Sequence, residues 1–122
     1  MLKERMKEIK RINTLAEFEG LKNSTLKNSE LLLFKYSPAC TISFVAEKLF
    51  DRWFGGLPEE SNIVCAKIDV LALKPLSRHI ADEFSIQHES PQLIWLNKEG
   101  KVKWHGSHHQ INERALGLSF TK

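Results

Sequence analysis

The sequence feature that most constrains the fold is an apolar run followed at once by a turn and an amphipathic helix. Residues 31–34 read Leu-Leu-Leu-Phe, which is typical of a central strand covered on both faces. A Ser-Pro pair then breaks the strand. Apolar residues recur at helical spacing from Ile42 to about Phe54, where a Gly-Gly pair ends the helix. The pattern predicts that Cys40 lies at or beside the first turn of this helix. The predicted buried face of the helix consists of Ile42, Val45, Ala46, Leu49 and Phe50.

A cysteine in this position is expected to be reactive. The first N–H groups of a helix have no partner within the helix and carry the positive end of its dipole. They stabilise a thiolate relative to a thiol, and the thiolate is the nucleophile. Ser43 follows Cys40 at Cys-x-x-Ser spacing, so we expect its hydroxyl and its backbone N–H to reach the sulfur. The alternative is that Cys40 merely fills a helix start as a small apolar residue.

Length, composition and charge limit the class of protein. The chain of 122 residues is long enough to bury the core of one domain. Its net charge of +3 is mild and dispersed, which argues against nucleic-acid binding. No apolar run approaches the roughly 20 residues that span a bilayer, and residues 1–8 lack the apolar core of a signal peptide. We expect a cytoplasmic protein with no membrane partner, in which residues 1–8 are a charged extension and residues 9–122 form the domain. Nothing in the sequence demands more than a monomer.

The remaining patterns alternate strands and helices. The expected elements are an edge strand within 8–13, a helix capped by Thr14 and Glu17, the strand and helix around Cys40, a strand over 62–70, a helix from Lys74 to Phe84, a hairpin over 92–105 and a last helix from Ser107 to near Gly117. Successive β-α-β units favour parallel strands with right-handed crossovers. We therefore predict a single-domain α/β fold with a mixed central sheet and helices on both faces, in an order that resembles thioredoxin.

Three motifs carry a more specific resemblance. Residues 34–43, Phe-Lys-Tyr-Ser-Pro-Ala-Cys-Thr-Ile-Ser, are similar to the Phe-Lys-His-Ser…Cys-x-Ile-Ser signature of the bacillithiol-system YtxJ-like family, the monothiol bacilliredoxins. Residues 89–92, Glu-Ser-Pro-Gln, resemble their Ser-Pro-Gln segment, and residues 104–108 resemble their closing Ser-His segment. The similarity extends from about Ile9 to Leu118. Tyr36 replaces a common histidine, and Thr41 stands where many members have proline.

The resemblance implies a thioredoxin-like fold and a monothiol thiol-disulfide oxidoreductase. Its nucleophile would be Cys40, and its substrates would be client proteins S-thiolated by bacillithiol or a similar low-molecular-weight thiol. The resemblance also implies that Pro91 is a cis-proline and that the backbone at Ser90 pairs with the bound thiol chain. No cofactor is implied beyond the low-molecular-weight thiol as co-substrate.

The residues themselves define a mechanism for a single thiol. Cys40 attacks a mixed disulfide and takes up the adduct, and because position 43 is serine, a second thiol molecule or a partner protein must release it. Cys65 is the only internal candidate for a resolving thiol, but it lies within an apolar strand where burial is expected. Whether Cys65 participates stays open. The candidate catalytic residues are Cys40 and Ser43, and the candidate substrate-binding residues are Ser37, Pro38, Thr41, Ser90, Pro91 and His108.

Other interpretations stay open. His105, His108 and His109 could suggest a metal, but the adjacent pair points apart and lacks a ligand at suitable spacing, so we predict no metal site. A non-catalytic binding or adaptor module with a thioredoxin fold is one alternative function. A glutathione-linked monothiol redoxin is another, although the Gly-Phe-Ser usual after its cysteine is absent.

Overall fold

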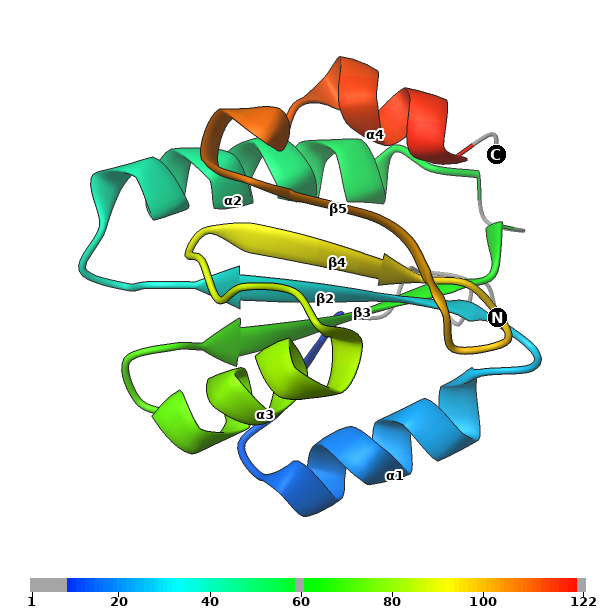
Figure 1. Cartoon of the computed structure of the whole chain (residues 1–122). Helices are drawn as coiled ribbons and strands as arrows, with labels where there is room; N and C mark the ends of the chain where they lie inside the picture. The colour runs from blue at the N-terminus through cyan, green and yellow to red at the C-terminus, as the bar shows by residue number, and fades with distance from the viewer. Residues whose placement is uncertain (1–8, 59–60, 121–122) are drawn as a thin grey trace.

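The central feature of the computed structural model is a five-stranded mixed sheet with helices on both faces (Figure 1). The structure describes residues 9–58 and 61–120, so the extension predicted at residues 1–8 lies outside them. The elements are β1 (Ile9–Arg11), α1 (Leu15–Thr25), β2 (Glu30–Tyr36), α2 (Thr41–Gly55), β3 (Ile63–Asp69), α3 (Lys74–Phe84), β4 (Gln92–Leu96), β5 (Val102–Ser107), the 3₁₀ turn η3 (His108–Gln110) and α4 (Glu113–Phe120). The predicted α/β fold and mixed sheet are confirmed.

The sheet has the strand order β1-β3-β2-β4-β5, so the apolar run forms the central strand, as predicted. β2 pairs with β3 in parallel and with β4 in antiparallel fashion. Because β4 runs opposite to β2, the last residues of β2 and the first residues of β4 lie at the same end of the sheet. Lys35 near the end of β2 is opposite Gln92 at the start of β4. The turn into α2 and the loop into β4 are therefore neighbours.

The core consists of two layers, one on each face of the sheet. Residues 31–34 alternate between them, as side chains of a strand must. Leu31 and Leu33 pack with Phe18 of α1 and Ile80 of α3. Leu32 and Phe34 pack on the other face with Phe50 and Phe54 of α2, Leu116 of α4 and Trp95 of β4. All four residues of the run are fully buried, which explains its unbroken apolar character.

The helix α2 has the predicted bounds but a different buried face. Its buried residues are Ser43, Ala46, Phe50 and Phe54. Ile42 and Val45 were expected in the core, but they are 47% and 58% exposed, so this part of the prediction is wrong. The buried face begins with a serine, and the apolar residues beside it face outward. Exposed apolar side chains therefore lie within the first turns after Cys40.

The predicted last helix is divided in the structure. The turn η3 ends at Gln110, and α4 begins only at Glu113. Asn112 Oδ1 accepts a hydrogen bond of 2.9 Å from the N–H of Ala115, which caps α4 as a separate helix. The expectation of one helix starting after Ser107 is therefore wrong. In the described part of the chain, no helix combines the length and apolarity needed to cross a bilayer.

Candidate active site

Cys40 occupies the position directly before α2. Its backbone is extended, with φ −114° and ψ 125°, and its carbonyl accepts the N–H of Phe44 at 3.1 Å. Its own N–H donates to the carbonyl of Ser37 at 3.2 Å, which closes a tight turn through exposed Pro38. The thiol is free and half-buried. The predicted placement at a helix start is confirmed, because Cys40 directly precedes the first residue of a 15-residue helix.

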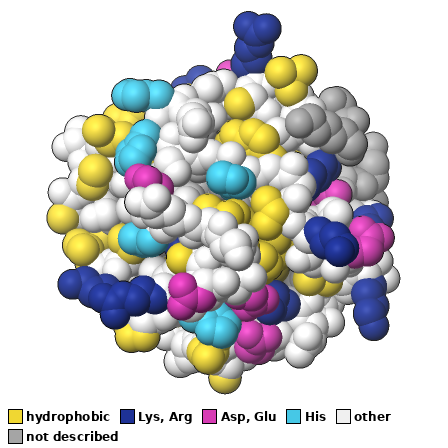
Figure 2. Space-filling model, in the orientation of Figure 1, with side chains coloured by type: hydrophobic (Ala, Val, Ile, Leu, Met, Phe, Trp, Pro, Cys, Tyr) yellow, Lys and Arg dark blue, Asp and Glu magenta, His cyan; other side chains and the backbone are white. Residues whose placement is uncertain are grey.

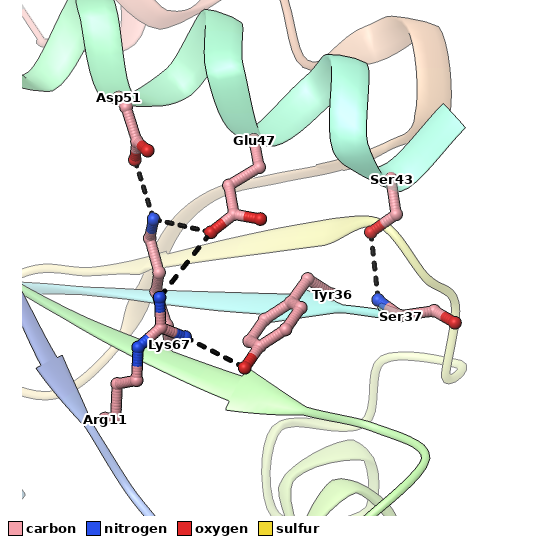
Figure 3. Close-up of polar contacts among 7 residues, drawn as sticks. All are labelled: Arg11, Tyr36, Ser37, Ser43, Glu47, Asp51 and Lys67. Atoms are coloured by element: carbon pink, nitrogen blue, oxygen red, sulfur yellow. Dashed lines mark hydrogen bonds and ion pairs between the residues drawn. The ribbon is translucent and has the colours of Figure 1, made fainter. Parts of the chain in front are cut away.

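Ser43 lies in the first turn of α2 and is only 1% exposed. Its Oγ accepts a hydrogen bond of 2.9 Å from the backbone N–H of Ser37 (Figure 3). The bond ties the chain before Cys40 to the helix after it. The expected contact of Ser43 with the sulfur is not formed: among the described residues no hydrogen bond joins the two, and the hydroxyl oxygen of Ser43 instead accepts the bond that holds the turn.

The loop before β4 lies beside this turn. Its Ser90–Pro91 peptide bond is cis, as the resemblance implies. Pro91 is buried, and its carbonyl accepts the N–H of His108 at 3.1 Å. Lys35 pairs with Gln92. Because the strands are antiparallel, Tyr36, which follows Lys35, and Pro91, which precedes Gln92, lie at the end of the sheet where Cys40 lies.

His108 connects the cis-proline loop to α2. It adopts the left-handed conformation at φ 52°, and its side chain is exposed with Nε2 3.7 Å from Glu89 Oε1. His108 and Thr41 line one groove of about 320 Å³. The groove residues are Thr41, Ile42, Val45, Ala46, Leu49, His108, His109, Ile111 and Asn112. Figure 2 shows hydrophobic and histidine side chains together on the left of the molecule, over the end where α2 begins in Figure 1. The predicted binding residues are thus gathered at one end of the sheet.

A polar cluster missed at the sequence level lies between α2 and the sheet. Lys67 is 3% exposed, and its Nζ donates to Glu47 Oε2 and Asp51 Oδ1, both at 2.7 Å (Figure 3). Burial disfavours this ammonium, but the hydrogen bonds and charges of Asp51 and Glu47 outweigh burial and raise the pKa of Lys67. Arg11 donates to Tyr36 Oη at 2.8 Å and lies 3.9 Å from Glu47. The i, i+4 spacing of the two acids was a signal, and the cluster fixes α2 one turn beyond Ser43.

Cys65 lies in the core rather than at the site. It is fully buried on β3 within the layer that contains Leu32 and Phe50. Burial raises the pKa of the Cys65 thiol; the charge of Lys67 opposes this rise, and the acids Asp51 and Glu47 add to it. The predicted burial is confirmed. A protonated, enclosed thiol is a poor nucleophile, and Cys40 is the more accessible of the two cysteines.

Away from Cys40, one group of side chains has the composition of a metal site. Oxygen or nitrogen atoms of Glu19, His79 and Glu83 lie within 4.8 Å of one another between α1 and α3. Lys22 already bonds Glu83 and lies 3.3 Å from Glu19, so an ammonium balances the two carboxylates. This group lies on the face of the sheet opposite α2, away from Cys40.

Comparisons with known proteins agree with this geometry. A protein-family model described as monothiol bacilliredoxin BrxC matches residues 10–116. Among solved structures, a proposed oxidoreductase with a thioredoxin fold has a TM-score of 0.76 at 24% identity, covering 91% of this chain and 92% of that one. Thioredoxin of Fasciola hepatica has a TM-score of 0.70 at 20% identity, with 92% and 96% covered. Thioredoxin NaTrxh of Nicotiana alata has a TM-score of 0.71 at 16% identity, with 95% and 92% covered. At such identities the structures establish a thioredoxin fold.

Proposed function

Because the chain belongs to the monothiol bacilliredoxin family, we propose that it removes bacillithiol, or a similar low-molecular-weight thiol, from mixed disulfides on client proteins. The observation that carries this function is the free, half-buried thiol of Cys40 at the start of α2, beside the loop that leads into β4. This arrangement suits a nucleophilic thiolate that accepts one half of a disulfide. The reaction needs no cofactor other than the low-molecular-weight thiol, and it suits a reducing cytoplasm.

The first step is a thiol-disulfide exchange. The Cys40 thiolate attacks the sulfur of the low-molecular-weight thiol in the client's mixed disulfide. A new bond forms between Cys40 and that sulfur, the original S–S bond breaks, and the client leaves as a thiolate that takes a proton from water. The adduct now resides on Cys40, and no net oxidation has occurred.

The second step requires a thiol from outside the chain. Position 43 offers a hydroxyl, and Cys65 is enclosed in the core. A second low-molecular-weight thiolate therefore attacks the adduct sulfur, which frees Cys40 and forms the symmetric disulfide of the small thiol. Ser43 supports the reaction by shaping the turn, and its O–H can also donate to the thiolate once Cys40 has ionised.

The surface around Cys40 supports a protein as the client. Ile42, Phe44 and Val45 are all exposed, and Phe44 is 59% exposed. Exposed apolar side chains that gather in one place are typical of surfaces that bind other molecules. The adjoining groove extends this surface from α2 to η3. A polypeptide chain flanking the S-thiolated cysteine could contact both.

The experiment that tests the function measures de-thiolation directly. A client protein carrying one bacillithiol adduct is incubated with the reduced enzyme, and intact masses of both proteins are followed over time. We expect loss of the client adduct and transient gain of one adduct on Cys40. A Cys40→Ser variant should be inactive, and Cys65→Ala is the matched control that should retain the rate.

Parallel reactions with glutathionylated client test the choice of thiol. Faster transfer from glutathione would identify a glutathione-linked redoxin instead. No transfer from either adduct, in a folded protein whose Cys40 can be alkylated, would leave a non-catalytic adaptor as the better account. Loss of two hydrogens without an adduct would show that Cys65 resolves Cys40, which contradicts the one-thiol mechanism.

A further inference from the structure

The ammonium of Lys35 is buried near the end of the central strand β2, close to the proposed site. Lys35 lies on β2 and has no solvent-exposed surface. Its Nζ donates to the carbonyl of Ser77 at 3.1 Å and lies 3.1 Å from His88 Nδ1. Unlike Lys67, which binds two acids, Lys35 forms no ion pair with a carboxylate within residues 9–58 and 61–120. Burial lowers the pKa of Lys35 to about 8. Burying a charge in the core without an ion-pair partner costs free energy, so the stability of the fold does not explain a lysine at this position.

Lys35 is surrounded by buried polar groups that lack some of their hydrogen-bond partners. Gln92, which is opposite Lys35 across the β2–β4 pair, is 1% exposed. Its Nε2 donates to the carbonyl of Gln87 at 2.9 Å. Within the described part of the chain, the buried side-chain atoms without a hydrogen-bond partner are Ser77 Oγ, Ser90 Oγ and Gln92 Oε1. All three belong to the segments that meet near Lys35. Apolar residues would stabilise this region better, and such local conflicts are expected at functional sites.

The contacts of Lys35 converge on the loop that precedes β4. His88 links this loop to Lys35, and Gln87 links it to Gln92. Because an ammonium only donates, His88 Nδ1 is the acceptor, and the ring is neutral. Burial and the charge of Lys35 lower the pKa of His88, which favours that state. Two buried side chains, those of Lys35 and Gln92, therefore hold this loop through its residues His88 and Gln87.

The same loop contacts the proposed site on its other side. Glu89 lies 3.7 Å from His108, and Pro91 accepts the N–H of that residue. Between these two contacts lies Ser90, whose peptide bond to Pro91 is cis. The path from Lys35 to the site therefore runs through three consecutive residues, His88, Glu89 and Ser90.

On the premise of the function proposed above, we propose that Lys35 is a positioning residue, whose ammonium holds His88 so that the backbone at Ser90 is presented to the disulfide bound at Cys40. Lys35 does not touch the reacting sulfurs. It acts through the loop, and its effect is on the binding of the mixed disulfide rather than on the reactivity of the thiol.

The bond between Lys35 and His88 exists only while the lysine is charged and the histidine is neutral. Protonation of His88 at low pH places two cations against each other, and deprotonation of Lys35 near pH 8 removes the charge-assisted bond. The other charged groups that act on His88 are Glu89 of the loop and Arg78 of α3. The loop should therefore be best ordered between these two titrations.

Variants at both ends of the bond test the inference. Lys35→Met keeps the unbranched apolar stem without the ammonium. His88→Leu removes the acceptor at an exposed position, so it remains informative if the lysine variant fails to fold. His88→Asn keeps an acceptor oxygen that cannot be protonated. Lys101→Met, at an exposed position in the β4–β5 turn, is the matched control.

Two readouts are compared for each variant, namely alkylation of Cys40 by iodoacetamide and the kinetics of client de-thiolation. For Lys35→Met and His88→Leu we expect alkylation within about twofold of the parent protein, because a small reagent needs no loop. De-thiolation should lose about tenfold or more in kcat/KM, mainly through a higher KM. His88→Asn should have the kcat/KM of the parent protein, unlike His88→Leu. In a plot of its kcat/KM against pH, the fall at acid pH should be absent. Parent-like kcat/KM in both Lys35→Met and His88→Leu would overturn the inference.

Amide hydrogen exchange over residues 86–90 gives a readout that needs no turnover. Faster exchange in Lys35→Met and His88→Leu, but not in Lys101→Met, is expected. If the parent protein de-thiolates no client yet the exchange pattern holds, the proposed function is wrong and the role of Lys35 in the loop stands. If exchange in both variants equals that of the parent protein, the positioning role is wrong whatever the activity.

Discussion

The backbone N–H of Ser37 donates a hydrogen bond of 2.9 Å to the side chain of Ser43, across the turn that holds Cys40. The serine that ends the Cys-x-x-Ser motif is therefore a structural part of the turn. It does more than replace a second cysteine. Its oxygen holds the chain that enters the site to the helix that leaves it.

Replacing Ser43 tests this bond. Ser43→Ala leaves the N–H of Ser37 without its partner, and we expect a loss of about 1–3 kcal/mol in the free energy of unfolding. Urea denaturation measures it, with Ser24→Ala on the surface of α1 as control. An unchanged midpoint for Ser43→Ala would show that the bond contributes nothing.

Ser43→Cys tests the mechanism at the same position. Sulfur accepts hydrogen bonds weakly, so the turn should loosen, but the new thiol lies at resolving spacing. We expect the adduct on Cys40 to disappear without added small thiol, with loss of two hydrogens in the intact mass. A stable adduct on this variant would mean that the turn keeps the two sulfurs apart.

The groove between α2 and η3 should affect client binding more than thiol chemistry. Val45 lines it and is 58% exposed, so Val45→Asp should leave folding nearly unchanged while raising KM for the client about fivefold or more. The control is Leu15→Asp on α1, which is similarly exposed at 45% but lies over the other face of the sheet. Equal KM values for the two variants would exclude the groove as a client contact.

The cluster around Lys67 should stabilise α2 against the sheet. In the double variant Glu47→Gln/Asp51→Asn the buried ammonium loses both anions, and we expect a loss of about 3 kcal/mol or more in the free energy of unfolding. Lys67→Met should cost less, because the two acids left behind are partly exposed and remain hydrated. Chemical denaturation at neutral pH compares them. The opposite order would show that leaving the ammonium of Lys67 buried without an anion costs little.

The pH dependence of stability should reveal Lys35. Burial lowers the pKa of Lys35 from 10.5 to about 8, so between these values the unfolded chain binds more protons than the folded one. The free energy of unfolding should then rise with pH across this window, relative to Lys35→Met, because folded Lys35 becomes neutral first. Below pH 8 both states are protonated and the difference is constant. Denaturation of both proteins from pH 7 to 10.5 measures it, and parallel curves would contradict a buried, titrating lysine.

The fold was predictable from sequence because its strongest signals are local. The apolar run at 31–34 and the Pro-flanked hairpin at 92–105 each specify burial or a turn within a few residues. The position of Cys40 follows from the same patterns. The prediction fails at Ile42 and Val45, where apolar periodicity indicates burial but the helix turns its small residues Ser43 and Ala46 inward. Apolar periodicity in a single sequence does not distinguish residues that pack in the core from apolar residues of an exposed binding surface.

The polar contacts beneath the site were not predictable in the same way. Lys35 and Lys67 lie in strands, where charged residues are normally expected on an exposed face. Their partners come from α3, α2 and the loop before β4, and nothing local links them. Only the packed fold brings these groups together. The division between η3 and α4 depends likewise on Asn112, which caps the second helix where the sequence permitted one continuous helix.

The antiparallel pairing of β4 with β2 has a consequence for how such a protein can diversify. The proposed nucleophile comes from residues 37–43, whereas the proposed receiving loop and the groove wall come from residues 87–91 and 107–112. These segments are separate in the gene and adjacent in space. A chimera that exchanges only the two later segments could therefore redirect the protein to new clients, while the first segment keeps its chemistry.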